Sequence, residues 1–250
     1  MPAAKLITAG YHVADKSFST QFDGADYRII IQKDLLSMAY TIPIPDNEDE
    51  RLKKLDEYNI MDSAPELVFD EITELAAQIL DCPISFIDFI NEDRQWFKSK
   101  YGVPDDMIET PRDMALCSHT ICQNDLLLVP DLTKDERFLD HSMVTFEPNL
   151  RFYAGMPLVT PKGHSIGTFC AIDFEPRELT LDQQQAMRQL SHKVVAQLEL
   201  RRTIIDMNEA IKSRDKIHDY LSAEKEKSDD LILNILLDKI EVELSETGKI

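Results

Sequence analysis

Apolar residues recur at helical spacing in the first part of the chain and gather into short β-rich runs after it. In "NEDERLKKLDEYNI" (47–60), Leu52, Leu55 and Ile60 fall on one helical face. The next segment, "LVFDEITELAAQILD" (67–81), has apolar residues three and four apart, and Pro83 blocks its continuation. The pattern therefore predicts two helices, the second with a buried face made of Val68, Ile72, Leu75, Ala76 and Ile79.

Short apolar runs in the middle of the chain indicate strands. "ISFIDFI" (84–90) and "QWFKSKYG" (95–102) flank the turn signal "NEDR", and "DLLLVPD" (125–131) is a brief third run. Two longer runs, 152–159 and 166–172, flank a turn at Pro161, Lys162 and Gly163. About five strands with helices before and after them predict an α+β fold around one antiparallel sheet.

The last seventy residues predict one long helix. No Pro or Gly occurs between Pro176 and Gly248, and Thr180 with Gln183 can form a capping box at the start. A seam of apolar residues weakens through 222–230 and then resumes, which indicates a coiled coil and a homodimer. The predicted dimer positions are Leu200, Ile204, Met207, Ile211, Leu231 and Ile235.

Charge and composition limit the kinds of partner that the chain can bind. The net charge of −19 argues against a nucleic-acid or anionic-membrane surface, since both require basic residues. No run of 18 apolar residues exists and no secretory signal opens the chain, so we expect no membrane span. The four cysteines are embedded in apolar sequence, which is typical of reduced thiols in a cytoplasmic protein.

Four blocks carry a family resemblance. "ERLKKLDEYNIMDSAPELVFDEITELAAQIL", "CPISFIDFINEDRQWFKSKYG", "ETPRDMALCSHTI" and "RFYAGMPLVTPKGHSIGTFCAID" together resemble the GAF domains of bacterial signalling proteins. The resemblance implies a PAS-like central antiparallel sheet, with helices on one side and a pocket for a small-molecule ligand on the other. It divides the chain into an unassigned extension (1–45), a GAF sensor domain (46–200) and a signalling helix (201–250).

The end of the chain carries a second resemblance. "EKEKSDDLILNILLDKIEVELSETGKI" is similar to the linker helix before the catalytic domain of class III adenylate and guanylate cyclases, with Leu237 where those linkers usually have Pro. The resemblance implies a regulatory chain that controls synthesis of cAMP or cGMP by an output domain absent from it. The linker Pro would end the helix sooner, so its replacement leaves the exit geometry open.

The GAF resemblance also implies which residues line the pocket: Phe86, Cys117, Phe152, Tyr153 and Cys170. Strand alternation places Phe169 and Ala171 on one side and Cys170 and Ile172 on the other, but does not say which side is the pocket. Gly155 is expected where a side chain would be costly, because of a bulge or a closely approaching ligand.

Several chemistries remain open at this level. Cys117 occupies the region where some GAF domains attach a bilin chromophore, and Cys117, Cys122 or Cys170 could serve a thiol-dependent reductase. "CSHTIC" (117–122) lacks the tight ligand pairs of structural zinc sites, so we predict no metal, and the cofactor is unknown.

Enzyme signatures are missing as well. The chain has no hydrolase, P-loop or zinc-protease motif, so no catalytic residue is predicted. Arg94 and Arg112 are expected to fix loops through Asp93, Glu109 or Asp113 rather than to act on a substrate.

Overall fold

The computed structural model describes residues 5–9, 17–22, 25–31 and 42–248. It divides into two compact units, residues 1–198 and residues 199–250. Within the described residues, no helix is both long and apolar enough to cross a membrane.

A small sheet precedes the main domain. It contains β1 (Lys5–Ala9), β2 (Ser17–Phe22) and β3 (Ala25–Ile31), in the order β1-β3-β2. β3 pairs in parallel with β1 and antiparallel with β2. These strands lie in the extension (1–45) that the sequence left unassigned, and residues 32–41 of it lie outside the described part of the chain.

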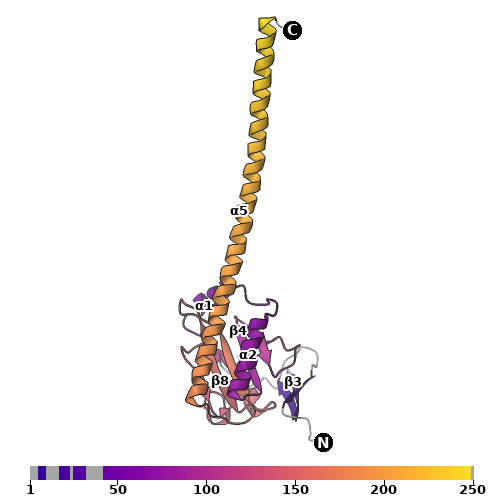
Figure 1. Cartoon of the computed structure of the whole chain (residues 1–250). Helices are drawn as coiled ribbons and strands as arrows, with labels where there is room; N and C mark the ends of the chain where they lie inside the picture. The colour runs from indigo at the N-terminus through magenta and orange to yellow at the C-terminus, as the bar shows by residue number, and fades with distance from the viewer. Residues whose placement is uncertain (1–4, 10–16, 23–24, 32–41, 249–250) are drawn as a thin grey trace. The chain divides into compact units, whose positions relative to one another are not determined.

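A six-stranded antiparallel sheet forms the centre of the main domain (Figure 1). Its order is β6-β5-β4-β9-β8-β7, so the strands nearest the middle are β4 (Ile84–Ile90) and β9 (Ser165–Asp173). The others are β5 (Arg94–Tyr101), β6 (Glu109–Pro111), β7 (Leu127–Val129) and β8 (Phe152–Val159). The predicted α+β fold is confirmed, with one short strand, β6, beyond the expected five.

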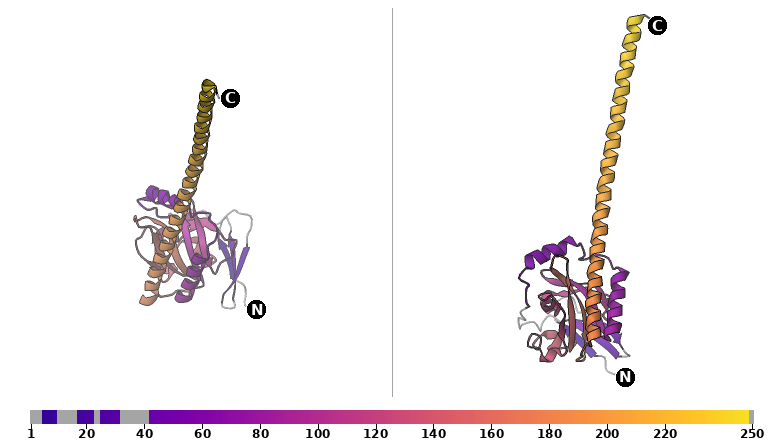
Figure 2. Two further views of the ribbon diagram at one scale, coloured as in Figure 1. Left: turned by 45° about the horizontal axis from the view of Figure 1, so that its top comes forward. Right: turned by 60° about the vertical axis from the view of Figure 1, so that its left-hand side comes forward.

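Helices cover one face of this sheet. α2 (Leu67–Leu80) and the first turns of α5 (Leu181–Thr247) lie over it in both views (Figures 1 and 2), and α1 (Glu48–Glu57) precedes them. Phe69 and Leu80 of α2, Met187 and Val194 of α5 and Phe169 of β9 belong to the core on this face. Alternate strand residues therefore meet a continuous helical layer.

The buried face of α2 is shifted along the chain by one residue from the predicted face, so that only Ala76 belongs to both. Phe69, Thr73, Ala76, Ala77 and Leu80 are buried, whereas Leu75 and Ile79 are 45% and 38% exposed. Thr73 can be buried because its hydroxyl lies within hydrogen-bond distance of the Phe69 carbonyl oxygen at 2.9 Å and of Ser99 Oγ at 2.8 Å. A search for apolar residues alone passes over such a paired threonine.

The opposite face of the sheet is covered by the segment between β6 and β8 (Figure 2). This segment contains α3 (Cys117–Thr120), α4 (Ser142–Thr145) and short 3-10 turns at Arg112–Met114 and Leu132–Lys134. Phe86, Cys117, Tyr153 and Cys170 belong to the second core, which lies between this segment and the sheet.

α5 is one uninterrupted helix of 67 residues, as its lack of Pro and Gly predicts. The expected capping box forms at its start. The Thr180 amide donates to Gln183 Oε1 at 3.0 Å, and the Gln183 amide donates to Thr180 Oγ1 at 3.2 Å. The helix continues through residues 222–230, where the apolar seam weakens.

Candidate functional site

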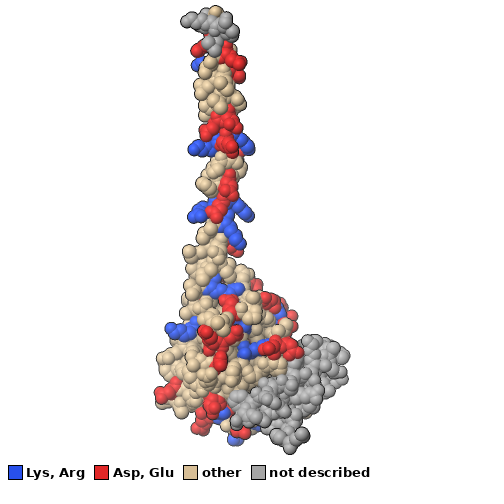
Figure 3. Space-filling view, turned by 45° about the vertical axis from the view of Figure 1, so that its right-hand side comes forward, with Lys and Arg blue, Asp and Glu red and all other residues tan. Residues whose placement is uncertain are grey.

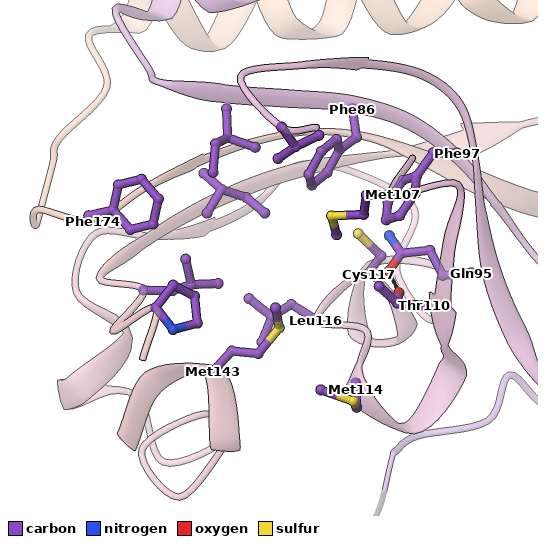
Figure 4. Close-up of a pocket in the computed structure, with 15 residues that line it drawn as sticks. Phe86, Gln95, Phe97, Met107, Thr110, Met114, Leu116, Cys117, Met143 and Phe174 are labelled. Carbon is purple, nitrogen blue, oxygen red and sulfur yellow. Dashed lines mark hydrogen bonds between the residues drawn. The ribbon is translucent and has the colours of Figure 1, made fainter. Parts of the chain in front are cut away.

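A cavity of about 60 Å³ lies within the core on the face away from α2 and α5 (Figure 4). Its wall is largely apolar, and Gln95, Thr110 and Cys117 add polar groups. Cys117 lies beside Met107 and Gln95 at one end, whereas Phe174 lies at the other end (Figure 4). A cavity of this size is well below the roughly 300–1,000 Å³ of pockets for drug-sized ligands.

A second hollow of about 260 Å³ adjoins the cavity. It is lined by Glu147, Pro148, Asn149, Arg151 and Phe174. Pro148 and Phe174 line both spaces, so these two side chains separate the cavity from the hollow.

Strand alternation on β4 places one carboxyl group on the face of the sheet that carries the cavity. Ile84, Phe86 and Ile90 belong to the core on this face, and Asp88 shares their parity. Asp88 is completely buried in a strand whose other six residues are five apolar residues and one serine. A buried carboxyl group requires partners, because desolvation penalises its charged form.

The hydrogen-bond partners of Asp88 Oδ2 are one hydroxyl and two thiols, and the Gln95 side chain also lowers the pKa of this carboxyl group. Thr168 Oγ1 donates to Asp88 Oδ2 at 2.7 Å. Cys117 Sγ and Cys170 Sγ lie 3.4 and 3.9 Å from the same oxygen and 3.8 Å from each other. These groups come from β4, β9 and α3, and only the folded chain brings them together.

A tyrosine extends the cluster. Tyr153 Oη lies 3.3 Å from Cys117 Sγ, to which it donates, and 2.6 Å from Thr120 Oγ1. Gly155 leaves room for this pair: a Cβ added there would lie 2.3 Å from Tyr153 Oη and 2.7 Å from Thr120 Oγ1. A side chain at Gly155 would be costly as expected, but the reason is the protein's own hydroxyl groups rather than a ligand.

Burial shifts the protonation of these groups. It raises the pKa of Asp88 from 3.8 to about 7, although the hydrogen bond from Thr168 opposes the shift. Burial also raises the pKa of Cys170 and of Tyr153 well above their ordinary values. Without a further cation, the two groups therefore remain protonated at neutral pH, and the Asp88 carboxyl group titrates near it.

The structure separates the five predicted pocket residues. Phe86 and Cys117 line the cavity. Tyr153 and Cys170 belong to the same core but lie behind the cavity wall, where they contact Cys117. Phe152 lies on the opposite face of the sheet, in the core beneath the helices, because it is adjacent to Tyr153 in the strand.

The "CSHTIC" motif does not converge on one point. Cys117 points toward Cys170, whereas Cys122 is exposed and its thiol donates to the Ser118 carbonyl oxygen at 3.4 Å. The ring of His119 packs edge-on against Phe138, with centroids 4.6 Å apart. The cysteine that meets Cys117 is therefore 53 residues away in the sequence.

The two arginines fix loops, although with different partners than expected. Arg94 donates to Glu109, as anticipated, and also to Asp62 at 2.7 Å. Arg112 pairs with Glu48 at 2.6 Å and donates to the Asn91 carbonyl oxygen at 2.9 Å. Neither pairs with Asp93 or Asp113 among the described ion pairs.

Asp88 was not among the site residues predicted from the sequence. The available signal was a single acid in the middle of the apolar run "ISFIDFI". An acidic residue is almost never fully buried unless it has partners, so its position alone marks a polar site inside the core.

A sequence model of the GAF domain family matches residues 64–198. A curated relative, a cyclic di-GMP phosphodiesterase of Pseudomonas aeruginosa, is 36% identical over 147 residues, which is 59% of this chain. The matched part spans only 25% of the relative's length.

Solved structures with a similar fold share little sequence. The GAF domain of an Acinetobacter phosphoenolpyruvate-protein phosphotransferase matches with a TM-score of 0.47 and 12% identity, over 65% of this chain and 99% of that domain. The chromophore-binding domain of a bacteriophytochrome from R. palustris matches with a TM-score of 0.47 and 11% identity, over 76% of this chain and 70% of that one. A free methionine-R-sulfoxide reductase from Thermoplasma acidophilum matches with a TM-score of 0.43 and 12% identity, over 61% of this chain and 95% of that one.

Proposed function

This chain belongs to the GAF domain family, and from that premise we propose that it is the cytoplasmic sensor of a signalling enzyme. In this proposal the chain pairs with a second copy through α5. A small ligand in the cavity biases the arrangement of the two helices, which in turn controls a nucleotide cyclase output.

The exposed apolar seam of α5 is the observation that carries the proposal. Leu200, Ile204, Met207 and Ile211 are 52%, 50%, 59% and 43% exposed in the single chain. They step by four, three and four residues, so they form one stripe along the helix. A second copy supplies the same stripe, and side-by-side pairing would remove both from water.

The far part of α5 has a second apolar stretch. Leu231 and Ile235 are 61% and 57% exposed, and Leu233, Leu236 and Leu237 beside them are more than half exposed. Charged side chains gather in bands along the helix, with stretches free of Lys, Arg, Asp and Glu between them (Figure 3). We propose that the polar segment 222–230 is the place where two paired helices change register between signalling states.

The size of the cavity supports a small ligand. About 60 Å³ admits a few water-sized groups, so a bilin or a cyclic nucleotide would require the core to open. A reductase receives less support, because Cys117 and Cys170 are buried, and partial burial raises the pKa of the exposed Cys122 thiol, whereas reactive thiols are partly exposed and have a lowered pKa.

Two outputs can follow such a sensor. The tail "LILNILLDKI" resembles cyclase linkers, which favours synthesis of cAMP or cGMP. The Pseudomonas relative is a cyclic di-GMP phosphodiesterase, which makes control of cyclic di-GMP the second candidate.

Oligomeric state tests the pairing. Light scattering should give twice the mass of 28.7 kDa for the full chain and for the control Glu209→Lys, which changes the opposite side of the helix. The double variant Ile204→Lys, Ile211→Lys should give the single mass, because four buried lysines would face one another across the seam. A double variant that remains dimeric would refute pairing through this stripe.

Fusions test the output. The full chain is joined at Ile250 to the catalytic domain of a class III cyclase, and in parallel to a cyclic di-GMP phosphodiesterase domain. We expect the seam variant to change cyclase activity at least tenfold relative to the Glu209→Lys control. A seam-dependent change in the phosphodiesterase fusion alone would support the second candidate instead.

A further inference from the structure

Three potential metal ligands meet at the cavity wall, where Cys117 lines the cavity and Asp88 and Cys170 lie behind it. Asp88 Oδ2, Cys117 Sγ and Cys170 Sγ form a triangle with sides of 3.4, 3.8 and 3.9 Å. Two sulfur ligands of a tetrahedral zinc ion lie about 3.8 Å apart, and a sulfur and an oxygen ligand lie about 3.5 Å apart, given Zn–S of about 2.3 Å and Zn–O of about 2.0 Å. We propose that Asp88, Cys117 and Cys170 bind a zinc ion.

The triangle also has the right radius. A point equidistant from its three corners lies about 2.2 Å from each, which is within the range of zinc–ligand bonds. An ion slightly out of the plane reaches all three atoms without movement of the backbone, and a water molecule can complete the tetrahedron.

Asp88 supplies an independent observation. Its side chain is completely buried, and its Oδ1 atom has no hydrogen bond within 3.5 Å among the described residues, although the Gln95 side chain is close enough to lower the pKa of this carboxyl group. A buried carboxylate oxygen without a partner is costly, so each such atom requires an explanation. A metal ion bound through both oxygens of this carboxylate would supply the missing partner, whereas an ion bound through Oδ2 alone would not.

Hydroxyl groups around the triangle provide the outer shell that metal sites require. Thr168 donates to Asp88 at 2.7 Å, and Tyr153 donates to Cys117 at 3.3 Å. Thr120, at 2.6 Å from Tyr153, holds that phenol in place. Such outer donors orient the ligands and stabilise a carboxylate and a thiolate.

The ligand set selects the kind of metal. Two sulfur atoms suit zinc, whereas calcium and magnesium prefer oxygen ligands. Zinc replaces the protons of both thiols as it binds, so its binding releases protons and strengthens as the pH rises.

The cavity adjoins the proposed site on one side. Cys117 lines the cavity, and Pro148 and Phe174 separate the cavity from the neighbouring hollow. The proposal goes beyond the sensor function and does not depend on it, because zinc can be bound whether or not α5 pairs.

Metal content tests the site directly. The full chain is treated with EDTA under a phosphine reductant, loaded with Zn²⁺, desalted and measured by elemental mass spectrometry. Wild type should retain one zinc per chain, and so should the controls Cys82→Ser and Cys122→Ser, whose thiols lie outside the cluster. Cys117→Ser and Cys170→Ser should retain less than a tenth of that amount, and Asp88→Asn should bind at least tenfold more weakly.

A measurement on the unaltered chain covers variants that fail to fold. Zn²⁺ should slow alkylation of Cys117 and Cys170 by iodoacetamide at least tenfold, as read by peptide mass spectrometry, and leave Cys122 unchanged. Co²⁺ in place of Zn²⁺ should give a thiolate charge-transfer band in the near ultraviolet. Wild type without bound zinc, equal retention in folded Cys117→Ser or Cys170→Ser, or unchanged alkylation would each overturn the proposal.

Discussion

The buried Asp88 carboxyl group makes the stability of the metal-free chain depend on pH. Its pKa is raised from 3.8 to about 7 in the folded state, chiefly by burial. The folded protein therefore keeps a proton that the unfolded chain releases between these two values. The stabilisation from this proton is fully present below about pH 4 and is lost as the pH rises through about 7.

The structure sets the magnitude. A shift of about three pH units corresponds to about 4 kcal/mol, and roughly 3 kcal/mol of it lies between pH 5 and pH 8. Asn in place of Asp88 cannot ionise. The free energy of unfolding of Asp88→Asn should therefore rise by roughly 3 kcal/mol relative to wild type between these pH values.

Urea denaturation in EDTA and reductant at pH 5 and pH 8 measures this difference. Burial also lowers the pKa of His119 and His141 to about 4, which acts in the opposite direction below about pH 6.5. Both histidines are present in wild type and variant, so their contribution cancels in the comparison. Parallel pH curves for the two proteins would show that Asp88 is ionised throughout and would refute the reasoning.

Three further predictions concern the same core and its edge. Gly155→Ala should lower the free energy of unfolding in urea by about 2 kcal/mol, because the new Cβ overlaps the Tyr153 hydroxyl. In the control Gly163→Ala the new Cβ has nothing within 4 Å, so this variant should lose only about 1 kcal/mol, for its positive φ. Equal losses in the two variants would contradict the clash. Arg51→Leu should lower the free energy of unfolding by roughly 3–5 kcal/mol, since it leaves Glu48 with one arginine fewer and the Ile90 carbonyl oxygen without its 2.6 Å donor. A melting temperature equal to that of wild type would argue against this. Tyr153→Phe should weaken zinc binding about tenfold in a competition titration while the fold is kept, and an unchanged affinity would remove Tyr153 from the outer shell.

The sequence predicted the main elements because their signals are local. Short apolar runs next to turn signals identified β4, β5, β8 and β9, and the absence of Pro and Gly identified α5 with its capping box. The buried face of α2 was predicted wrongly, because Thr73 is buried with its hydroxyl paired and Leu75 is exposed. A local sequence pattern depends on residue type alone, whereas the burial of a side chain depends on which part of the chain packs against it.

The site required the tertiary structure for a physical reason. Alternation separates Phe152 from Tyr153 but does not say which face has the cavity, because both faces of the sheet are buried. The position of the cavity depends on which segment covers each face of the sheet. That covering is made by contacts between residues far apart in the chain. Asp88, Cys117 and Cys170 show it most clearly: each lies in a different segment, and their shared chemistry arises because β4, α3 and β9 place three atoms within 4.8 Å of one another.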